Sequence, residues 1–448
     1  MAYLAFDAAD AQHQERADEQ QFSNLFWSSL VLSIGMAYFL RLPAVVGQRR
    51  MRDEFIDLMS SMLKDSAAEL FRDFQAVFSR TLRRFYDETD VPIGIFPTAA
   101  FTENLFATVI CIDAKIPVMI CGPPGCSKTL SFTIAVENMK GPASEKPLYQ
   151  KLHHLHPLRY QCSEQSTDTE IEAVYDSAIK RQVMFEGNDD PNCCTERAAV
   201  LLDEAGLPSE ETMPLKVIHY MMDHPQVATV ILTNKLLDAA KTNRALQVVQ
   251  SEPSNDGLRA LTRGCLYPHA IRLTDVQRAI VEGLCKAFTD IKSERAFAKS
   301  NGEEMFHLRD FIYFLRYLRK HSHSVDDRDF ELTGDVLLRA LQRNFNGIAA
   351  ESFEMLVQLF FASIDEQPHA PNLQLPTHLP IVSNLAPLRE SLADRLRDGE
   401  NPNTAAFRYV MVLDPTDTES SVSLLFSLNL LDQSQARIVC LGNFAEDE

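Results

Sequence analysis

Short apolar runs alternate with amphipathic stretches through the middle of the chain. The runs lie at residues 116–121, 158–163, 198–202 and 227–232. Apolar positions at helical spacing separate them, and Thr167-x-x-Glu170 matches a capping box at the start of one such stretch. Short apolar runs are typical of buried strands, and strands that alternate with helices predict a parallel sheet covered on both faces. We therefore expect an α/β domain here.

Helical spacing of apolar residues dominates on both sides of this domain, from residue 22 to 86 and from residue 274 to 361. Residues 25–40, LFWSSLVLSIGMAYFL, are the most apolar segment, and the basic residues Arg49, Arg50 and Arg52 follow it. A membrane-spanning helix needs about 20 apolar residues. This segment is shorter and contains serines, so we favour a buried helix over a membrane anchor.

Histidines cluster in residues 153–157, HHLHP. Histidine clusters bind metals, but we find no Cys or acidic partner at ligand spacing in the sequence. We therefore expect a surface loop here and no metal site. The pair Cys193-Cys194 lies in another expected loop, and we interpret it as incidental.

Length and composition limit the protein's class. The chain has 448 residues, 46% hydrophobic residues and a net charge of −19, which excludes a primary nucleic-acid binder. Nine Cys without regular spacing indicate free thiols in a reducing, cytoplasmic setting. We divide the chain into a helical N-terminal region (1–91), a large α/β domain (92–272), a helical lid (273–365), a Pro-rich linker (366–404) and an incomplete start of a further α/β module (405–448).

The first apolar run leads into a glycine-rich turn that ends in Lys-Thr. The expected phosphate-binding residues are Gly122, Pro123, Pro124, Gly125, Cys126, Ser127, Lys128 and Thr129. Backbone N–H groups of such a loop and the positive end of the next helix hold a polyphosphate. Lys128 can reach the β- and γ-phosphates, and the Thr129 hydroxyl can bind Mg²⁺. Ser127 stands where this pattern usually has Gly, so the loop predicts ATP or GTP with one departure.

Polar residues follow the next two buried runs. Asp203 and Glu204 end one, and Asn234 follows the other. Asp203 would hold Mg²⁺, while Glu204 would polarise the water that attacks the γ-phosphate. In a parallel sheet Asn234 would lie beside Asp203 and orient the same water.

Arginines supply candidates for neutralising the charge that develops in phosphoryl transfer. We expect Arg244 to project into a neighbouring subunit's site, with Arg263 as a second candidate; a surface ion pair is the alternative. Arg309 opens an amphipathic helix of the lid and could act as a second sensor or simply pair with Asp310.

The order of strand, phosphate-binding loop, Asp-Glu strand, Asn strand, arginine and helical lid resembles that of the AAA+ ATPases. Among these, the chain is similar to the mysterin family of giant E3 ubiquitin ligases. The resemblance spans about residues 25–448 and rests on CGPPGCSKTLSF, with Ser127 in place of Gly, on VLLDEAGLPSEETMPLKVIHYMMD, on ILTNKLLDAAKTNRAL and on LRDFIYFL. It implies an AAA+ P-loop fold with a helical lid, Mg-ATP as ligand, and neighbouring AAA+ units and the ubiquitin machinery as partners. No Cys/His array for a RING finger is present, so ligase chemistry would belong to another part of such a protein.

Two other functions remain open from the residues. The chain could be a nucleotide-binding structural element of a ring, similar to dynein-type units, without turnover. It could also be a membrane-anchored AAA+ ATPase that uses residues 25–40.

Overall fold

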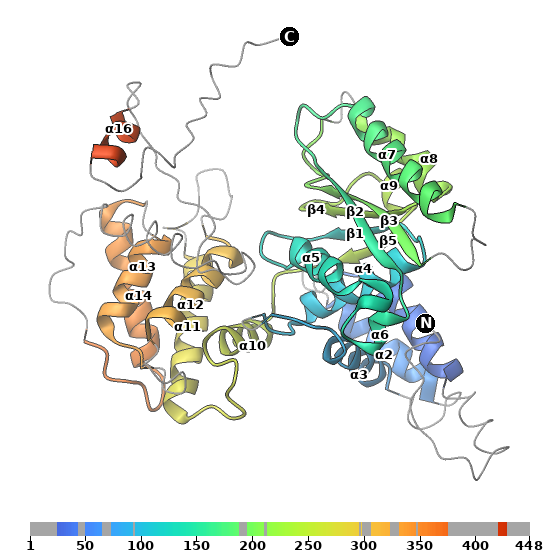
Figure 1. Cartoon of the computed structure of the whole chain (residues 1–448). Coiled ribbons are helices and arrows are strands. Elements are labelled where there is room, and N and C mark those ends of the chain that lie inside the picture. Colours follow the sequence, from blue (N-terminus) through green and yellow to red (C-terminus); the bar gives the residue numbers. More distant parts are fainter. Residues whose placement is uncertain are drawn as a thin grey trace. The chain divides into compact units, whose positions relative to one another are not determined.

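The structure is a computed structural model that describes residues 25–43, 50–64, 73–92, 95–187, 195–209, 213–294, 297, 306–322, 331–345, 348–374 and 420–427. The chain forms two compact units. The first contains the chain up to Gly264 together with His307–Arg309, and the second contains Cys265–Phe306 and the chain from Asp310 onward (Figure 1).

A five-stranded parallel sheet is the centre of the first unit. Its strands are β1 (Val118–Cys121), β2 (His154–Gln161), β3 (Glu196–Asp203), β4 (Ala228–Thr233) and β5 (Leu246–Val249). Their order in the sheet is β2-β3-β4-β1-β5, and every described pair is parallel. This confirms the predicted α/β fold. Strand β5 was not anticipated, because its four residues, LQVV, include a polar Gln.

Helices cover both faces of this sheet, as Figure 1 shows. Val118 and Ile120 of β1 belong to the core cluster shared with α4 (Ala99–Asp113) and α5 (Lys128–Asn138). Met119, between them, faces the second cluster with α7 (Asp168–Glu186) and α8 (Ile218–Asp223). Strands buried on both faces read as continuous apolar runs, which explains the sequence pattern. The other helices of this part of the chain are α6 (Pro147–Gln150), α9 (Ala239–Thr242) and α10 (Asn255–Leu266).

The capping box predicted from Thr167 and Glu170 is present at the start of α7. The Thr167 hydroxyl accepts from the Glu170 N–H, and the Glu170 carboxylate accepts from the Thr167 N–H. These bonds satisfy two of the amides that a helix start leaves unpaired, which fixes where α7 begins.

The N-terminal helices pack on the same unit. Residues 25–34 are helical and continue into a π-helical turn, Gly35–Phe39, followed by α2 (Met51–Lys64) and α3 (Phe74–Asp87). Phe39, Phe55, Phe74 and Phe78 pack against one another, with ring centroids between 5.5 and 5.9 Å apart. Residues 25–40 therefore bury one side against α2 and α3, and among the described residues no helix is long and apolar enough to span a membrane.

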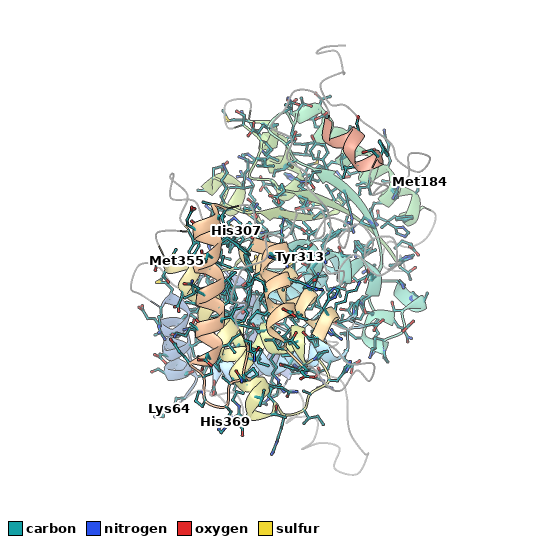
Figure 2. The ribbon with its side chains drawn as sticks, turned by 90° about the vertical axis from the view of Figure 1, so that its left-hand side faces the viewer. Lys64, Met184, His307, Tyr313, Met355 and His369 are labelled. Atoms are coloured by element: carbon teal, nitrogen blue, oxygen red, sulfur yellow. The ribbon has the colours of Figure 1, made fainter. Side chains whose placement is uncertain are left out.

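The second unit is helical where it is described. It contains α11 (Asp275–Ser293), most of α12 (Leu308–Ser322), α13 (Gly334–Phe345), α14 (Ala350–Asp365) and the short α16 (Ser420–Ser427). Phe314 packs against Phe345 and Phe360, with ring centroids 5.5 and 5.3 Å away. Tyr313 and Met355 mark α12 and α14 in Figure 2. All of these helices except α16 lie within the segment predicted to be a helical lid.

One sequence expectation was wrong. Residues 154–157 of HHLHP are not a loop but the first half of β2, paired in register with β3 from Glu196 onward. The apolar pattern was hidden because His and Pro interrupt it, while an edge strand tolerates Pro. Cys193, Cys194, most of the expected linker and most of the expected further module lie outside the described residues.

A substitution at Gly35 tests how the π-helical turn packs against α3. A Cβ on Gly35 would lie 2.3 Å from the Phe78 ring, so Gly35→Leu forces the π-helical turn away from α3. Overpacking costs about 2 kcal/mol, and we expect denaturant unfolding to show this loss. Tyr38 is 62% exposed, so Tyr38→Leu is the matched control and should change the unfolding free energy by less than about 0.5 kcal/mol. Equal effects of the two variants would contradict the packing.

Candidate functional site

The glycine-rich loop Gly122–Thr129 joins β1 to α5. Ser127 is the N-cap of α5, and its backbone is left-handed, with φ 62° and ψ 24°. Gly125, two residues earlier, also has a positive φ of 95°. L-residues avoid this conformation and Gly does not, which is a physical reason for Gly at the position before the Lys. Ser127 adopts the same conformation at some conformational cost.

Lys128 lies folded over this loop with its side chain largely buried. Its ammonium donates to the Asn234 side-chain oxygen at 2.8 Å and to the Pro123 carbonyl at 3.1 Å. Asn234 comes directly after β4, the neighbour of β1. The Lys128 ammonium therefore links the loop to the residue that follows β4.

The predicted magnesium residues also meet. The Thr129 hydroxyl lies 3.4 Å from Oδ2 of Asp203, which is the last residue of β3. The Asn234 amide donates to Glu204 at 2.7 Å. Glu204 has a positive φ of 52°, and its N–H donates to Asp203 at 2.9 Å. Strained backbone at a non-Gly residue is common at functional sites, and here it aims adjacent carboxylates in two directions.

Buried thiols near this group are kept neutral. Burial, with a smaller effect from the charges of Asp203 and Glu204, raises the pKa of Cys162 to about 12. Burial also raises the pKa of Cys126 in the loop, outweighing the opposite effect of Lys128. At neutral pH both thiols are protonated, so neither is a thiolate nucleophile or an anionic ligand.

The candidate arginines make none of the hydrogen bonds above, but Arg309 borders the loop: a Cβ on Gly125 would lie 2.9 Å from the Arg309 backbone nitrogen. Arg244 follows α9, and its Nε donates to both carboxylate oxygens of Asp223 at 3.0 and 2.9 Å. Arg263 lies on α10 and has partners of its own. Arg309 is the second residue of α12 and belongs to the short segment that groups with the first unit. Their roles stay predictions.

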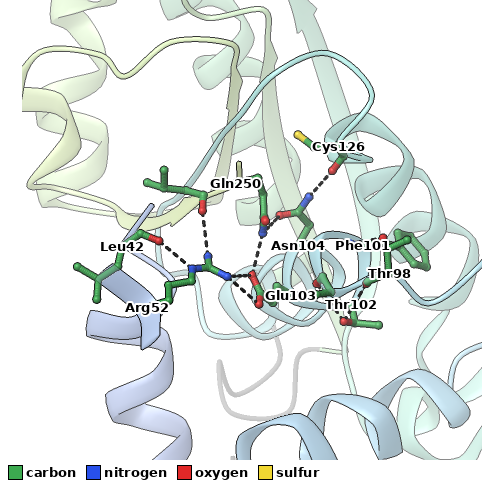
Figure 3. Close-up of polar contacts among 11 residues, drawn as sticks. Leu42, Arg52, Thr98, Phe101, Thr102, Glu103, Asn104, Cys126 and Gln250 are labelled. Carbon is green, nitrogen blue, oxygen red and sulfur yellow. Dashed lines mark hydrogen bonds and ion pairs between the residues drawn. The ribbon is translucent and has the colours of Figure 1, made fainter. Parts of the chain in front are cut away.

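A buried polar network supports the loop from behind (Figure 3). Asn104 of α4 donates to the Cys126 carbonyl at 2.9 Å. Gln250, directly after β5, donates to Asn104 and to Glu103, both at 3.0 Å. The backbone N–H of Gln250 donates to the Cys121 carbonyl at 2.7 Å. The loop conformation is thus held by side chains from two other segments.

Arg52 of α2 completes this network. Its Nη1 lies 3.0 Å from each carboxylate oxygen of Glu103, and the two side chains are 15% and 6% exposed. Its other nitrogens donate to the carbonyls of Leu42 at 2.8 Å and Val249 at 3.0 Å. A guanidinium is suited to such a fork because it carries five donors in a fixed plane.

Sequence reasoning missed these supporting residues. Arg52 appeared only as part of a basic cluster, and no motif assigned a role to Glu103, Asn104 or Gln250. Up to 197 positions separate the partners, so no local spacing could have indicated the contacts.

Strand order, phosphate loop and the Asp-Glu strand end together define an AAA+ ATPase fold. A family model described as the RNF213 AAA domain matches residues 94–257. The chain is 32% identical over 479 residues to an uncharacterized transmembrane protein of Dictyostelium discoideum, an alignment covering 94% of this chain and 8% of that protein. It is 25% identical over 461 residues to the E3 ubiquitin-protein ligase RNF213 of Homo sapiens, covering 100% of this chain and 8% of the relative.

Residues 94–257 match the AAA domain of this family, so the chain contains an AAA+ unit of the RNF213, or mysterin, type. It spans only a small part of these curated relatives, 8% of each of the two described above. Solved structures with a similar fold include Trip13 from Rhizobiales, with 13% identity, a TM-score of 0.30 and coverage of 78% of this chain and 95% of that one. A RuvB variant from Thermotoga maritima has 11% identity, a TM-score of 0.28 and coverage of 59% and 82%. Scores this low carry no weight beside the sheet topology.

Arg52 offers a test of the supporting network. Arg52→Met leaves the Glu103 carboxylate buried without its cation, and we expect a loss of about 3 kcal/mol in the free energy of unfolding. Replacing both residues, in Arg52→Met/Glu103→Met, should recover much of this loss because no buried charge remains. The measurement is denaturant unfolding of each variant.

Arg50 supplies the matched control. It lies 3.7 Å from Asp53, with both side chains more than half exposed, and Arg50→Met should cost less than about 1 kcal/mol. If Arg52→Met were as mild as Arg50→Met, the network would not hold α2 to the loop.

Proposed function

We propose that this AAA+ unit binds and hydrolyses Mg-ATP. The observation that carries the proposal is the convergence of five polar residues at one end of the sheet. Thr129 and Asp203 lie 3.4 Å apart, and Lys128 is linked through Asn234 to Glu204 by bonds of 2.8 and 2.7 Å. These residue types are the ones that phosphoryl transfer requires, and each stands at the end of a strand or the start of a helix.

The residues fit a nucleotide with its magnesium. The N–H groups of Gly122–Thr129 and the start of α5 would hold the phosphates, and Lys128 would leave its carbonyl partners for the β- and γ-phosphates. The Thr129 and Asp203 oxygens suit Mg²⁺, which binds hard oxygen ligands. The metal would supply charge neutralisation on the phosphates.

Glu204 is the general base in this proposal. Its carboxylate already accepts from Asn234, so the amide would hold it in position to take a proton from the attacking water. The adjacent Asp203 lies near Thr129 instead. The acid that would bind the metal and the acid that would act as general base are therefore different residues.

Arginines would complete the site from outside. Arg244 would have to exchange Asp223 for the γ-phosphate of a neighbouring AAA+ unit, and Arg309 would act as the second sensor. Hydrolysis would therefore depend on assembly, in cis or between chains. A nucleotide-binding ring element without turnover is the competing outcome.

The relatives' names set the wider context of the proposal. The relatives from Homo sapiens, Danio rerio and Mus musculus are called E3 ubiquitin-protein ligases, and this chain spans only 5% to 8% of their length. We infer that this ATPase unit serves a ubiquitin ligase of the mysterin type by changing conformation with its nucleotide. The buried free thiols fit a reducing compartment such as the cytoplasm.

Glu204→Gln tests hydrolysis directly. Removing the base while keeping the shape should lower phosphate release at least about 100-fold and leave ATP affinity within about threefold. Lys128→Ala should instead abolish ATP binding. Calorimetry with Mg-ATP and a phosphate-release assay measure the two effects.

Glu172→Gln, an exposed acid on α7, is the control and should match the unaltered chain. Equal turnover by Glu204→Gln and the control would contradict the proposal that Glu204 is the general base of ATP hydrolysis. ATP binding without turnover at every protein concentration would favour the ring element.

Ser127 offers a second test because its backbone is left-handed. Ser127→Val places a β-branched residue where φ is positive, and we expect ATP affinity to fall by about tenfold. Ser127→Gly fits this conformation and should bind at least as tightly as the unaltered chain. Ser177→Val, exposed on α7, controls for the added methyl groups. Binding unchanged in Ser127→Val would show that the loop conformation is not required.

A further inference from the structure

Residues His154, His156 and Glu196 form a cluster at the opposite end of the sheet from the phosphate loop. One nitrogen of each histidine and one oxygen of the glutamate all lie within 4.8 Å of one another. His154 and Glu196 are register partners at the beginning of β2 and β3. Asp203 ends β3 seven residues after Glu196, so the cluster lies about 23 Å from the magnesium residues.

Parallel pairing is what brings the three side chains together. His154 and His156 are two residues apart on one strand, so their side chains leave the same face. Their rings lie 4.4 Å apart, and His154 Nδ1 lies 3.1 Å from Oε2 of Glu196. His156 Nε2 contacts the same oxygen. Two ligand atoms on a tetrahedral zinc ion are about 3.4 Å apart, so the cluster is already near coordinating separation.

The surroundings hold this arrangement in place. The ring of Phe185 on α7 packs 4.5 Å from the His156 ring, beside exposed Met184, which Figure 2 labels. Gln182, one turn earlier on α7, accepts from the Ala198 N–H at 2.8 Å, which ties α7 to β3 next to Glu196. Contacts of this kind orient ligands and limit water access on one side.

We propose that His154, His156 and Glu196 bind a divalent transition metal of the zinc class. Two imidazoles and one carboxylate match the donor set of zinc sites and exclude Mg²⁺ and Ca²⁺, which prefer oxygen ligands. The three side chains are between 28% and 40% exposed, so solvent reaches the fourth position. A metal here would join the edge strand β2 to β3 at the end away from the nucleotide.

The experiment uses the full chain without a purification tag, strips it of metal by dialysis against a chelator, and then measures the zinc that it binds when zinc is returned. We expect the unaltered chain to hold about one more equivalent of zinc than His154→Gln/His156→Gln, with zinc raising the unfolding temperature only in the former. His269→Gln, an exposed histidine outside the cluster, should keep the zinc of the unaltered chain.

Glu196→Gln keeps the acceptor oxygen and the size of the side chain, so it guards against loss of folding in the double variant. We expect it to weaken zinc binding at least about tenfold while its metal-free unfolding temperature stays unchanged. Cobalt(II) as the probe should give the absorption of a four-coordinate nitrogen and oxygen site. Unchanged zinc content in both cluster variants, or a thiolate charge-transfer band with cobalt, would overturn the proposal.

Discussion

Parallel pairing of β3, β4 and β1 is the constraint on which the rest of the first unit depends. Each of these strands carries its polar residues at or just past its carboxyl end, and only parallel alignment brings those ends to one edge. Leu202 pairs with Ile231 and Cys121 with Thr233, which places Asp203, Asn234 and the phosphate loop side by side. Parallel pairing of β2 with β3 likewise aligns the amino ends of these strands, where the two histidines meet Glu196. The carboxyl ends and the amino ends of the strands thus carry chemically different side chains.

The phosphate loop is the least regular part of this arrangement and the best supported. The left-handed backbone at Ser127 is unfavourable by itself, so the loop conformation depends on the side chains that pack behind it. Asn104 bonds the loop carbonyl, Gln250 bonds Asn104, and Glu103 bonds both Gln250 and Arg52. Because Arg52 belongs to α2, the N-terminal helices are an integral part of the first unit and not an appendage. A shift of those helices would reach the loop through three buried polar side chains.

Several expectations from the sequence were confirmed because their signals are local. Apolar runs identified β1, β3 and β4, the Thr167 capping box located the start of α7, and helical spacing identified α11 to α14. The HHLHP segment failed because a strand at the sheet edge needs pairing on one side only, so His and Pro are accommodated there. The acidic partner that was not found near the histidines is Glu196, which lies 40 residues after His156 in the sequence.

By itself the sequence determined the α/β class, the phosphate loop, the Asp-Glu strand end and the family resemblance, because those features depend on residues adjacent in the chain. Ser127 was recognised there as a departure, and its left-handed backbone supplies the physical reason why Gly usually occupies the position. Only the tertiary structure decided which distant residues meet: Arg52 with Glu103, Lys128 with Asn234, and His156 with Glu196. Such contacts are set by strand order and helix packing, and neither is encoded in spacing along the chain.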